Sequence, residues 1–220
     1  MERIRRSPVY WLENYSWSVD EHIRGGDNER QLYHGAPFID PGTLLPMREL
    51  DGSRDDYLLY TASVWWNTDL LCVPKSRQLR LTHMMVNLHG WLAMMHPGQR
   101  IAIQSKKEED ADATLKRLES SFEIMRKNAP FLPWPIPTFK YARCVFPNGS
   151  IIMAVQQGAA AVRQYTFSAI FSDEMAFQFE AEDAYTAAIP TIEGGGKYTA
   201  VSSAHPGFFQ KLCFDTADAA

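Results

Sequence analysis

The amino-acid sequence predicts an α/β fold with a mostly parallel central sheet flanked by helices. Short apolar runs typical of buried strands alternate with longer segments whose apolar residues recur at helical spacing. Parallel strands need long crossover connections, usually helices, so this alternation favours a parallel sheet. The chain has 220 residues, of which 45% are hydrophobic, and this is enough to bury the core of one substantial domain.

The first half of the chain contains two strand-helix units. Turn signals at 25–29 and 40–42, with little periodicity around them, predict that residues 1–50 form an arm ahead of a domain at 51–220. In chain order we then expect a helix from Asp51 past Trp65, a strand at 69–73, a helix at 84–95 ended by Pro97-Gly98, a strand at 100–105 and an amphipathic helix at 106–128.

The second half begins with a proline-rich break at 129–138 and continues the alternation. The segments YARCVF and IIMAV flank Asn148-Gly149, a sequence typical of a hairpin turn, so we expect a hairpin there. A strand at 166–174, a helix at 180–189, a glycine turn at 194–196 and a strand at 197–204 follow. The chain shows no internal repeat.

Composition excludes several classes of protein. The formal net charge of -4 argues against a static nucleic-acid coat, although a local basic patch could still grip DNA transiently. Cys72, Cys144 and Cys213 are far apart in sequence and lack zinc-ligand spacing, which fits a reducing cytoplasm. No apolar run approaches the roughly 18 residues of a membrane span, so we expect no membrane partner.

Polar segments follow four of the expected strands. Ligands of open parallel sheets bind beyond the carboxyl ends of the strands, so these segments should converge at one edge. They read PKSRQLRLT at 74–82, QSKKEED at 104–110, SDE at 172–174 and SSAHP at 202–206. Together they supply what nucleoside triphosphate hydrolysis needs: cations and amides for phosphate, a hydroxyl and a carboxylate for Mg2+, and a carboxylate to orient water.

Each of these segments also has a simpler interpretation. Asp173-Glu174 can be the polar start of a helix, and the basic residues after Pro74 can form a solvated turn. Their occurrence together and in this order favours the nucleotide site. Thr82 would open a helix, where its hydroxyl reaches a metal while the helix N-terminus faces phosphate.

The segment KSRQLRLT resembles the variant phosphate-binding loop of phage terminase large subunits, the ATPase motors that pump viral DNA into procapsids. QSKKEEDA, IFSDEMAF, VSSAHP and the opening SPVYWLENY resemble further segments of that family in the same order. The resemblance covers nearly the whole chain. It implies a P-loop NTPase fold of the ASCE type and a motor that hydrolyses ATP with Mg2+.

The resemblance also implies roles for individual residues. Lys75 would contact the β- and γ-phosphates, with Ser76, Arg77, Gln78, Arg80 and Thr82 completing the nucleotide-binding loop. Thr82 and Asp173 would hold Mg2+, and Glu174 would polarise the attacking water. Arg163 would sense or neutralise γ-phosphate charge, within one subunit or on its neighbour. The coupling motif would be Ser202, Ser203 and Ala204.

Three positions depart from the family pattern. Arg80 replaces the glycine usual in the loop, Leu81 replaces the terminal lysine, and the segment 46–50 lacks the glutamine usual before an adenine pocket. The guanidinium of Arg80 could crowd the phosphate or add positive charge to the site.

The resemblance implies partners and a location as well. These are double-stranded DNA, held transiently, a portal protein, a small terminase subunit and further copies of the chain in a ring on the procapsid, all in the host cytoplasm. The family's usual nuclease domain is not expected in this chain. Two alternatives remain: a superfamily 2 helicase-like ATPase, and a docking module whose nucleotide pocket is catalytically dead.

Other conspicuous residues predict structure. His83, His89 and His96 do not share the helix face that a metal site would need, so we expect core and boundary positions. The segment 194–197 imitates a phosphate loop, but Tyr198 follows it instead of Ser or Thr and a strand instead of a helix, which indicates a turn. Four tryptophans could stack nucleic-acid bases, but their places on helices and beside prolines favour packing in the core: Trp65, Trp66, Trp91 and Trp134.

Overall fold

The computed structural model of the chain describes residues 1–16, 57–77 and 79–214. The turn signals at 25–29 and 40–42, the segment 46–50, the start of the helix expected from Asp51, and Gln78 all lie outside these residues. None of the helices in the described part is long and apolar enough to cross a membrane.

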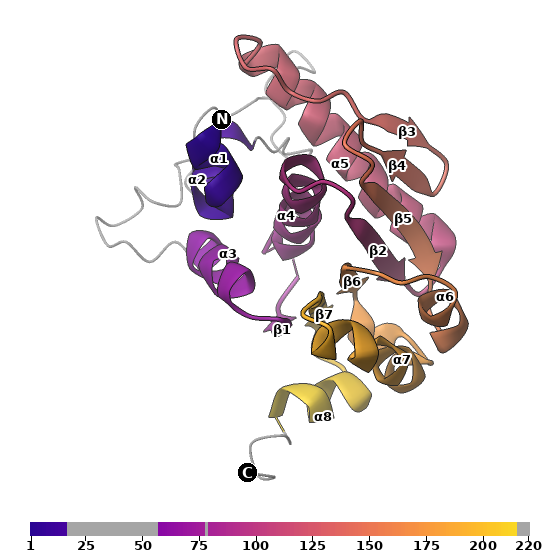
Figure 1. The fold of residues 1–220 in the computed structure, drawn as a ribbon. Coiled ribbons are helices and arrows are strands. Elements are labelled where there is room, and N and C mark those ends of the chain that lie inside the picture. Colours follow the sequence, from indigo (N-terminus) through magenta and orange to yellow (C-terminus); the bar gives the residue numbers. More distant parts are fainter. Residues whose placement is uncertain (17–56, 78, 215–220) are drawn as a thin grey trace, which may run out of the picture.

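A seven-stranded sheet in the order β1-β7-β6-β2-β5-β4-β3 forms the centre of the molecule (Figure 1). β1, β7, β6, β2 and β5 run parallel, and β4 and β3 pair antiparallel at one edge. The strands are β1 (Leu70–Lys75), β2 (Arg100–Ser105), β3 (Thr138–Lys140), β4 (Arg143–Val145), β5 (Ile151–Gln156), β6 (Ala169–Asp173) and β7 (Lys197–Ser203). The predicted mostly parallel sheet is confirmed, and so is the hairpin β4-β5.

Helices cover both faces of the sheet (Figure 1). They are α1 (Glu2–Arg6), α2 (Pro8–Tyr15), α3 (Tyr57–Asn67), α4 (Leu81–Met95), α5 (Glu108–Asn128), α6 (Ala159–Arg163), α7 (Ala181–Glu193) and α8 (Phe208–Phe214), with a 3-10 helix η2 (Met175–Phe177). α2, α3, α4 and α5 pack in one core cluster, and α6, α7 and α8 pack in a second.

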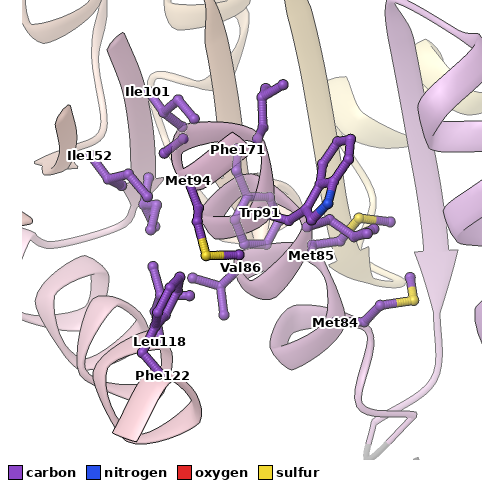
Figure 2. Close-up of a cluster of buried hydrophobic side chains, with 14 of the residues drawn as sticks. Met84, Met85, Val86, Trp91, Met94, Ile101, Leu118, Phe122, Ile152 and Phe171 are labelled. Atoms are coloured by element: carbon purple, nitrogen blue, oxygen red, sulfur yellow. The ribbon is translucent and has the colours of Figure 1, made fainter. Parts of the chain in front are cut away.

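Successive side chains along the buried strands point alternately into the two core clusters, one on each face of the sheet. Ile101 and Ile103 of β2 belong to the core with α4 and α5, whereas Ala102 between them faces the other core. This is the period of two expected when a strand is covered on both sides. Figure 2 shows the larger core, where Met84, Met85, Val86 and Trp91 of α4 meet Phe171 of β6 and Leu118 of α5.

α4 is buried nearly all round, as expected for a helix between a sheet and other helices. His89 lies in its middle, with 0% of its surface exposed, stacked 5.4 Å from the ring of Phe171. Burial lowers the pKa of His89 to about 4, so this side chain is neutral. Its ring nitrogen Nδ1 lies 2.7 Å from the Met85 carbonyl oxygen. His89 is therefore a core residue, as the sequence predicts, and the same holds for Trp65, Trp91 and Trp134. Trp66, also expected in the core, is only partly buried and packs against the core from its boundary.

The N-terminal helices are a feature that the sequence does not predict. Ser7 caps α2 by accepting a hydrogen bond from the Tyr10 amide at 3.1 Å, and Pro8 occupies the first turn. Leu12 is 0% exposed, and Trp91 of α4 donates from its indole nitrogen to the Ile4 carbonyl at 2.9 Å. Both helices are too short to show periodicity, and they are part of the main core. β3 and α6 are not predicted either, because with 3 and 5 residues they are also too short to show periodicity.

The cysteines remain thiols, as expected, but two of them are neighbours. Cys72 of β1 and Cys213 of α8 pack against the same core cluster, and each affects the pKa of the other. Burial, together with this neighbour, raises the pKa of Cys72 to about 12. Both thiols help to pack α8 against the sheet.

Lys197 ties the end of α3 to the start of β7. Its ammonium group donates to the carbonyl oxygens of Trp65 (3.1 Å), Trp66 (3.1 Å) and Thr68 (2.8 Å). These carbonyls lie at the C-terminus of α3. The last carbonyl groups of a helix have no amide donor within the helix, and the helix dipole favours a cation there. Desolvation lowers the pKa of Lys197, which is consistent with its burial. The glycine turn before it, with Gly195 at φ +82°, is confirmed as a turn.

We predict that Lys197→Met lowers the free energy of unfolding by about 2 kcal/mol, because carbonyls bonded to a charged donor lose that donor while remaining sheltered. Chemical denaturation measures the change. Lys211→Met, at an exposed position on α8, is the matched control and should stay within about 0.5 kcal/mol of the parent. Equal effects of the two substitutions would contradict a special role for Lys197.

Candidate functional site

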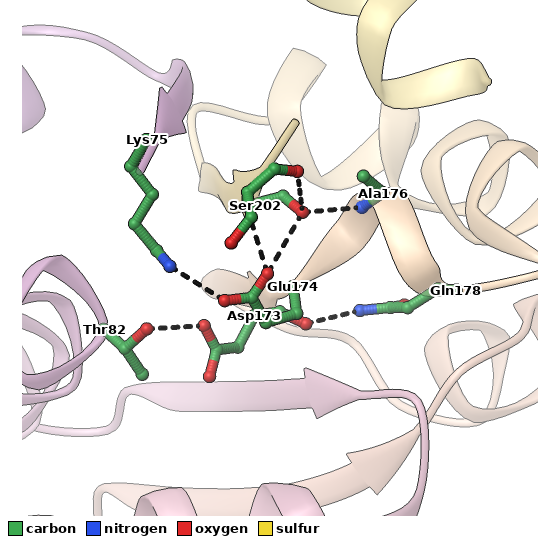
Figure 3. A network of polar contacts seen from close by, with 8 residues as sticks. Lys75, Thr82, Asp173, Glu174, Ala176, Gln178 and Ser202 are labelled. Atoms are coloured by element: carbon green, nitrogen blue, oxygen red, sulfur yellow. Dashed lines mark hydrogen bonds and ion pairs between the residues drawn. The ribbon is translucent and has the colours of Figure 1, made fainter. Parts of the chain in front are cut away.

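The carboxyl ends of β1, β7 and β6 bring the predicted site residues together (Figure 3). Lys75 is the last residue of β1 and pairs in register with Ser203 of β7, while Asp173 ends β6. β7 lies between β1 and β6, so Lys75 and Glu174 are two strand spacings apart, roughly 10 Å. Only long side chains can meet across that span.

Lys75 and Glu174 do meet there. The Lys75 ammonium lies 2.8 Å from Glu174 Oε1, and 7% of the lysine side chain and 38% of the glutamate side chain are exposed. A lysine so sheltered needs an anion, because an unpaired buried charge costs several kcal/mol. In this structure Glu174 supplies that anion.

The second carboxylate oxygen of Glu174 is bound by β7. Glu174 Oε2 accepts hydrogen bonds from the Ser203 amide at 3.0 Å and from the Ser202 hydroxyl at 3.3 Å. Partial burial acts to raise the pKa of Glu174, but the hydrogen bonds from Lys75 and Ser203 outweigh it, so the pKa lies below its ordinary value. Glu174 is therefore a carboxylate at neutral pH.

Asp173 lies beside this pair in a different environment. It is 7% exposed, and its Oδ1 accepts a hydrogen bond from the Thr82 hydroxyl at 2.8 Å. Burial raises the pKa of Asp173, although the bond from Thr82 opposes the change. Among the described residues no cation forms an ion pair with this carboxylate.

Thr82 and Asp173 are the residues that could hold a divalent cation. A hydroxyl and a carboxylate are the hard oxygen ligands that Mg2+ prefers, and Mg2+ usually takes few protein ligands and keeps several waters. A cation there would also stabilise the charged form of Asp173, which burial disfavours. The pair therefore fits Mg2+.

The backbone is strained on both sides of the site. Arg80 (φ 55°) and Glu174 (φ 50°) adopt the left-handed conformation that favours glycine. Arg80 precedes α4 at the position where the resembling family has glycine, so the loop keeps the glycine conformation with an arginine in it. Such strain costs of order 1–3 kcal/mol and clusters at functional sites.

A second set of contacts holds the turn that carries Glu174. The Gln178 side-chain amide donates to the Asp173 carbonyl at 2.9 Å and lies 3.0 Å from the Ser172 hydroxyl. The Ser202 hydroxyl accepts from the Ala176 amide at 3.0 Å. Sequence reasoning missed Gln178, because a glutamine four residues after an acidic pair carries no recognised pattern.

Other predicted residues lie outside this network. Ser76 and Arg77 are exposed in the loop, and Ala204 is exposed just after β7. Arg163 is exposed at the end of α6, and within the described part of the chain no hydrogen bond or ion pair joins it to Lys75 or Glu174. The structure therefore brings together Lys75, Thr82, Asp173, Glu174, Ser202 and Ser203 but not Arg163.

No protein-family profile and no curated protein sequence matches the chain. Several solved structures, however, have a similar fold. The large terminase of bacteriophage HK97 is 12% identical, with a TM-score of 0.63 over 98% of this chain and 41% of that one. A mutant large terminase ATPase domain of Thermus phage P74-26 is 13% identical, with a TM-score of 0.55 over 75% of this chain and 72% of that domain. The large terminase of another thermophilic bacteriophage is 15% identical, with a TM-score of 0.55 over 75% of this chain and 42% of that protein.

At such low identity the likeness concerns the fold, and the chain spans less than half of the HK97 protein and of the third terminase. The chain has the α/β, P-loop fold of phage large terminase ATPase domains.

Proposed function

We propose that the chain is the ATP-hydrolysing motor domain of a phage terminase large subunit, which drives double-stranded DNA into a procapsid. The observation that carries the proposal is the meeting of Lys75, Thr82, Asp173 and Glu174 at the carboxyl edge of a sheet with the terminase fold. A cation, a hydroxyl and two carboxylates in separate environments are what phosphoryl transfer to water requires.

The contacts support a division of labour between the two carboxylates. Glu174, with a lowered pKa and partial exposure, is suited to orient a water and accept its proton. Asp173, buried against Thr82, is suited to anchor Mg2+ with that hydroxyl. Bound Mg2+ would neutralise charge on the phosphate oxygens.

The Lys75–Glu174 ion pair defines the nucleotide-free resting state of the ATP hydrolysis cycle. Lys75 can bind the β- and γ-phosphates only if it leaves Glu174, and Glu174 can orient water only if it is released from Lys75. The triphosphate competes with Glu174 for one ammonium group, so binding itself frees the carboxylate. Ser202 and Ser203, which hold Glu174 from β7, would sense that release and act as the coupling motif.

The exposure of Arg163 favours a role on a neighbouring subunit. An arginine supplied in trans is worth roughly 10^3–10^5 in rate in phosphate-transfer enzymes. This fits a ring of copies on the procapsid, with a portal protein, a small terminase subunit and DNA as partners in the host cytoplasm. The HK97 protein is more than twice as long as the matched region, so packaging by the whole motor is part of the proposal.

We expect Lys75→Ala to reduce phosphate release from ATP by roughly 10^2–10^3-fold, the usual cost of removing one group that stabilises developing charge. Binding of ATP should weaken more than binding of ADP, because the γ-phosphate loses its cation. Lys127→Ala, at an exposed position in the last turn of α5, is the matched control and should behave as the parent. Wild-type turnover by Lys75→Ala would refute the role of Lys75.

Glu174→Gln should separate binding from chemistry. The amide keeps the shape of the side chain but no longer neutralises Lys75, so Mg-ATP should bind as tightly as in the parent or more tightly, while hydrolysis falls by at least ~10^2-fold. Asp173→Asn should instead make binding less dependent on Mg2+. Fluorescent-nucleotide titration with and without Mg2+, run beside phosphate release, measures both. If Glu174→Gln lost nucleotide as badly as Lys75→Ala, the assignment would be wrong.

A mixing experiment tests the shared site. Arg163→Ala and Glu174→Gln should each be inactive alone, and an equimolar mixture should recover activity, because some sites then combine an intact glutamate with a neighbour's intact arginine. Phosphate release at fixed total protein measures the recovery. If each variant stays inactive in the mixture, or if Arg163→Ala is fully active alone, Arg163 does not act across subunits.

A further inference from the structure

We propose that Gln178 is a positioning residue that sets the direction of the Glu174 carboxylate. The inference rests on the proposed function, since it names the group that orients the residue assigned to the attacking water. It starts from the turn between β6 and η2, where the chain reverses immediately after Asp173.

The turn is held by the side chain of Gln178. This residue is 5% exposed, and its amide nitrogen donates one hydrogen to the Asp173 carbonyl (Figure 3). The other hydrogen goes to the Ser172 hydroxyl. Both acceptors belong to the end of β6. The glutamine therefore reaches back over η2 and ties the turn to the strand that it left.

Fixing the Asp173 carbonyl fixes Glu174. The peptide unit between the two residues is planar, so a bond to the carbonyl oxygen also orients the Glu174 amide and Cα. Glu174 is held at φ 50°, a conformation that a glutamate adopts only when its surroundings enforce it. The bond from Gln178 is the side-chain contact at that peptide, and it adds to the pairing of Asp173 with Val201 of β7 and to the bond from the Phe177 amide to the Glu174 carbonyl.

The role becomes decisive once nucleotide has bound. In the resting structure Lys75 and the Ser203 amide also hold the carboxylate. When Lys75 moves to phosphate, the side chain keeps only its contacts to β7 and the direction that the turn gives it. The hydrogen bonds of Gln178 go to the Asp173 carbonyl and the Ser172 hydroxyl, and none goes to the side chain of Lys75, Thr82 or Asp173, so it acts by placing the turn that carries Glu174.

The test compares Gln178→Met with Gln104→Met. Methionine keeps the volume and removes the donors. Gln104 on β2 is a matched control, since it is 0% exposed and its amide lies 3.3 Å from the Gln156 carbonyl and 3.5 Å from the Gly158 carbonyl, with no hydrogen bond to the turn. Two measurements are made on the full chain: amide hydrogen exchange across residues 173–177, and steady-state ATP hydrolysis.

For Gln178→Met we expect exchange across 173–177 to accelerate about tenfold, the factor corresponding to the net loss of about one hydrogen bond. We expect kcat to fall between ~10- and ~100-fold with KM within about twofold of the parent, as for a displaced catalytic group. Gln104→Met should show neither change.

Unchanged exchange in Gln178→Met, or a kcat loss no larger than that of Gln104→Met, would overturn the inference. If the parent chain itself released no phosphate from ATP, the proposed function would fail instead. The exchange measurement would then still decide whether Gln178 holds the turn.

Discussion

The ion pair between Lys75 and Glu174 is the interaction on which the rest of the site depends. Its two members come from strands that are not neighbours, so it spans β7 and is possible only at the edge where all three strands end. Each partner satisfies the charge of the other in a sheltered place. An anionic ligand that binds Lys75 more strongly than Glu174 does therefore releases the Glu174 carboxylate from its ion pair, without contacting Glu174 itself.

Glu174 is held by contacts of two kinds. The Ser203 amide and Ser202 hydroxyl bind its carboxylate, while the left-handed turn fixes its backbone. The Ser202 hydroxyl also accepts from the Ala176 amide, so β7 contacts both the side chain and the turn. Displacement of Glu174 by nucleotide would therefore change the hydrogen bonds that Ser202 and Ser203 of β7 make. This gives the coupling role of Ser202 and Ser203 a physical basis.

Much of the fold and part of the site could be predicted from sequence. The parallel sheet follows from strand-helix alternation, and the meeting of Thr82 with Asp173 follows from the rule that strand ends converge. α1 and α2 could not be predicted, since tertiary packing rather than periodicity stabilises such short helices. The pairing of Lys75 with Glu174 could not be predicted either. The sequence assigns both residues to bound nucleotide and water, and the strand order that lets them meet cannot be derived from local sequence. Gln178 bonds to residues five and six positions before it, a local contact for which the sequence has no recognised pattern.

The central claim is that phosphate replaces Glu174 as the partner of Lys75. A structure with a non-hydrolysable ATP analogue and Mg2+ tests it most directly. The account predicts the Lys75 ammonium within hydrogen-bond distance of β- and γ-phosphate oxygens, Mg2+ beside Thr82 and Asp173, and Glu174 turned toward a water in line with the γ-phosphate. An analogue bound elsewhere, with the Lys75–Glu174 pair still at 2.8 Å, would contradict it.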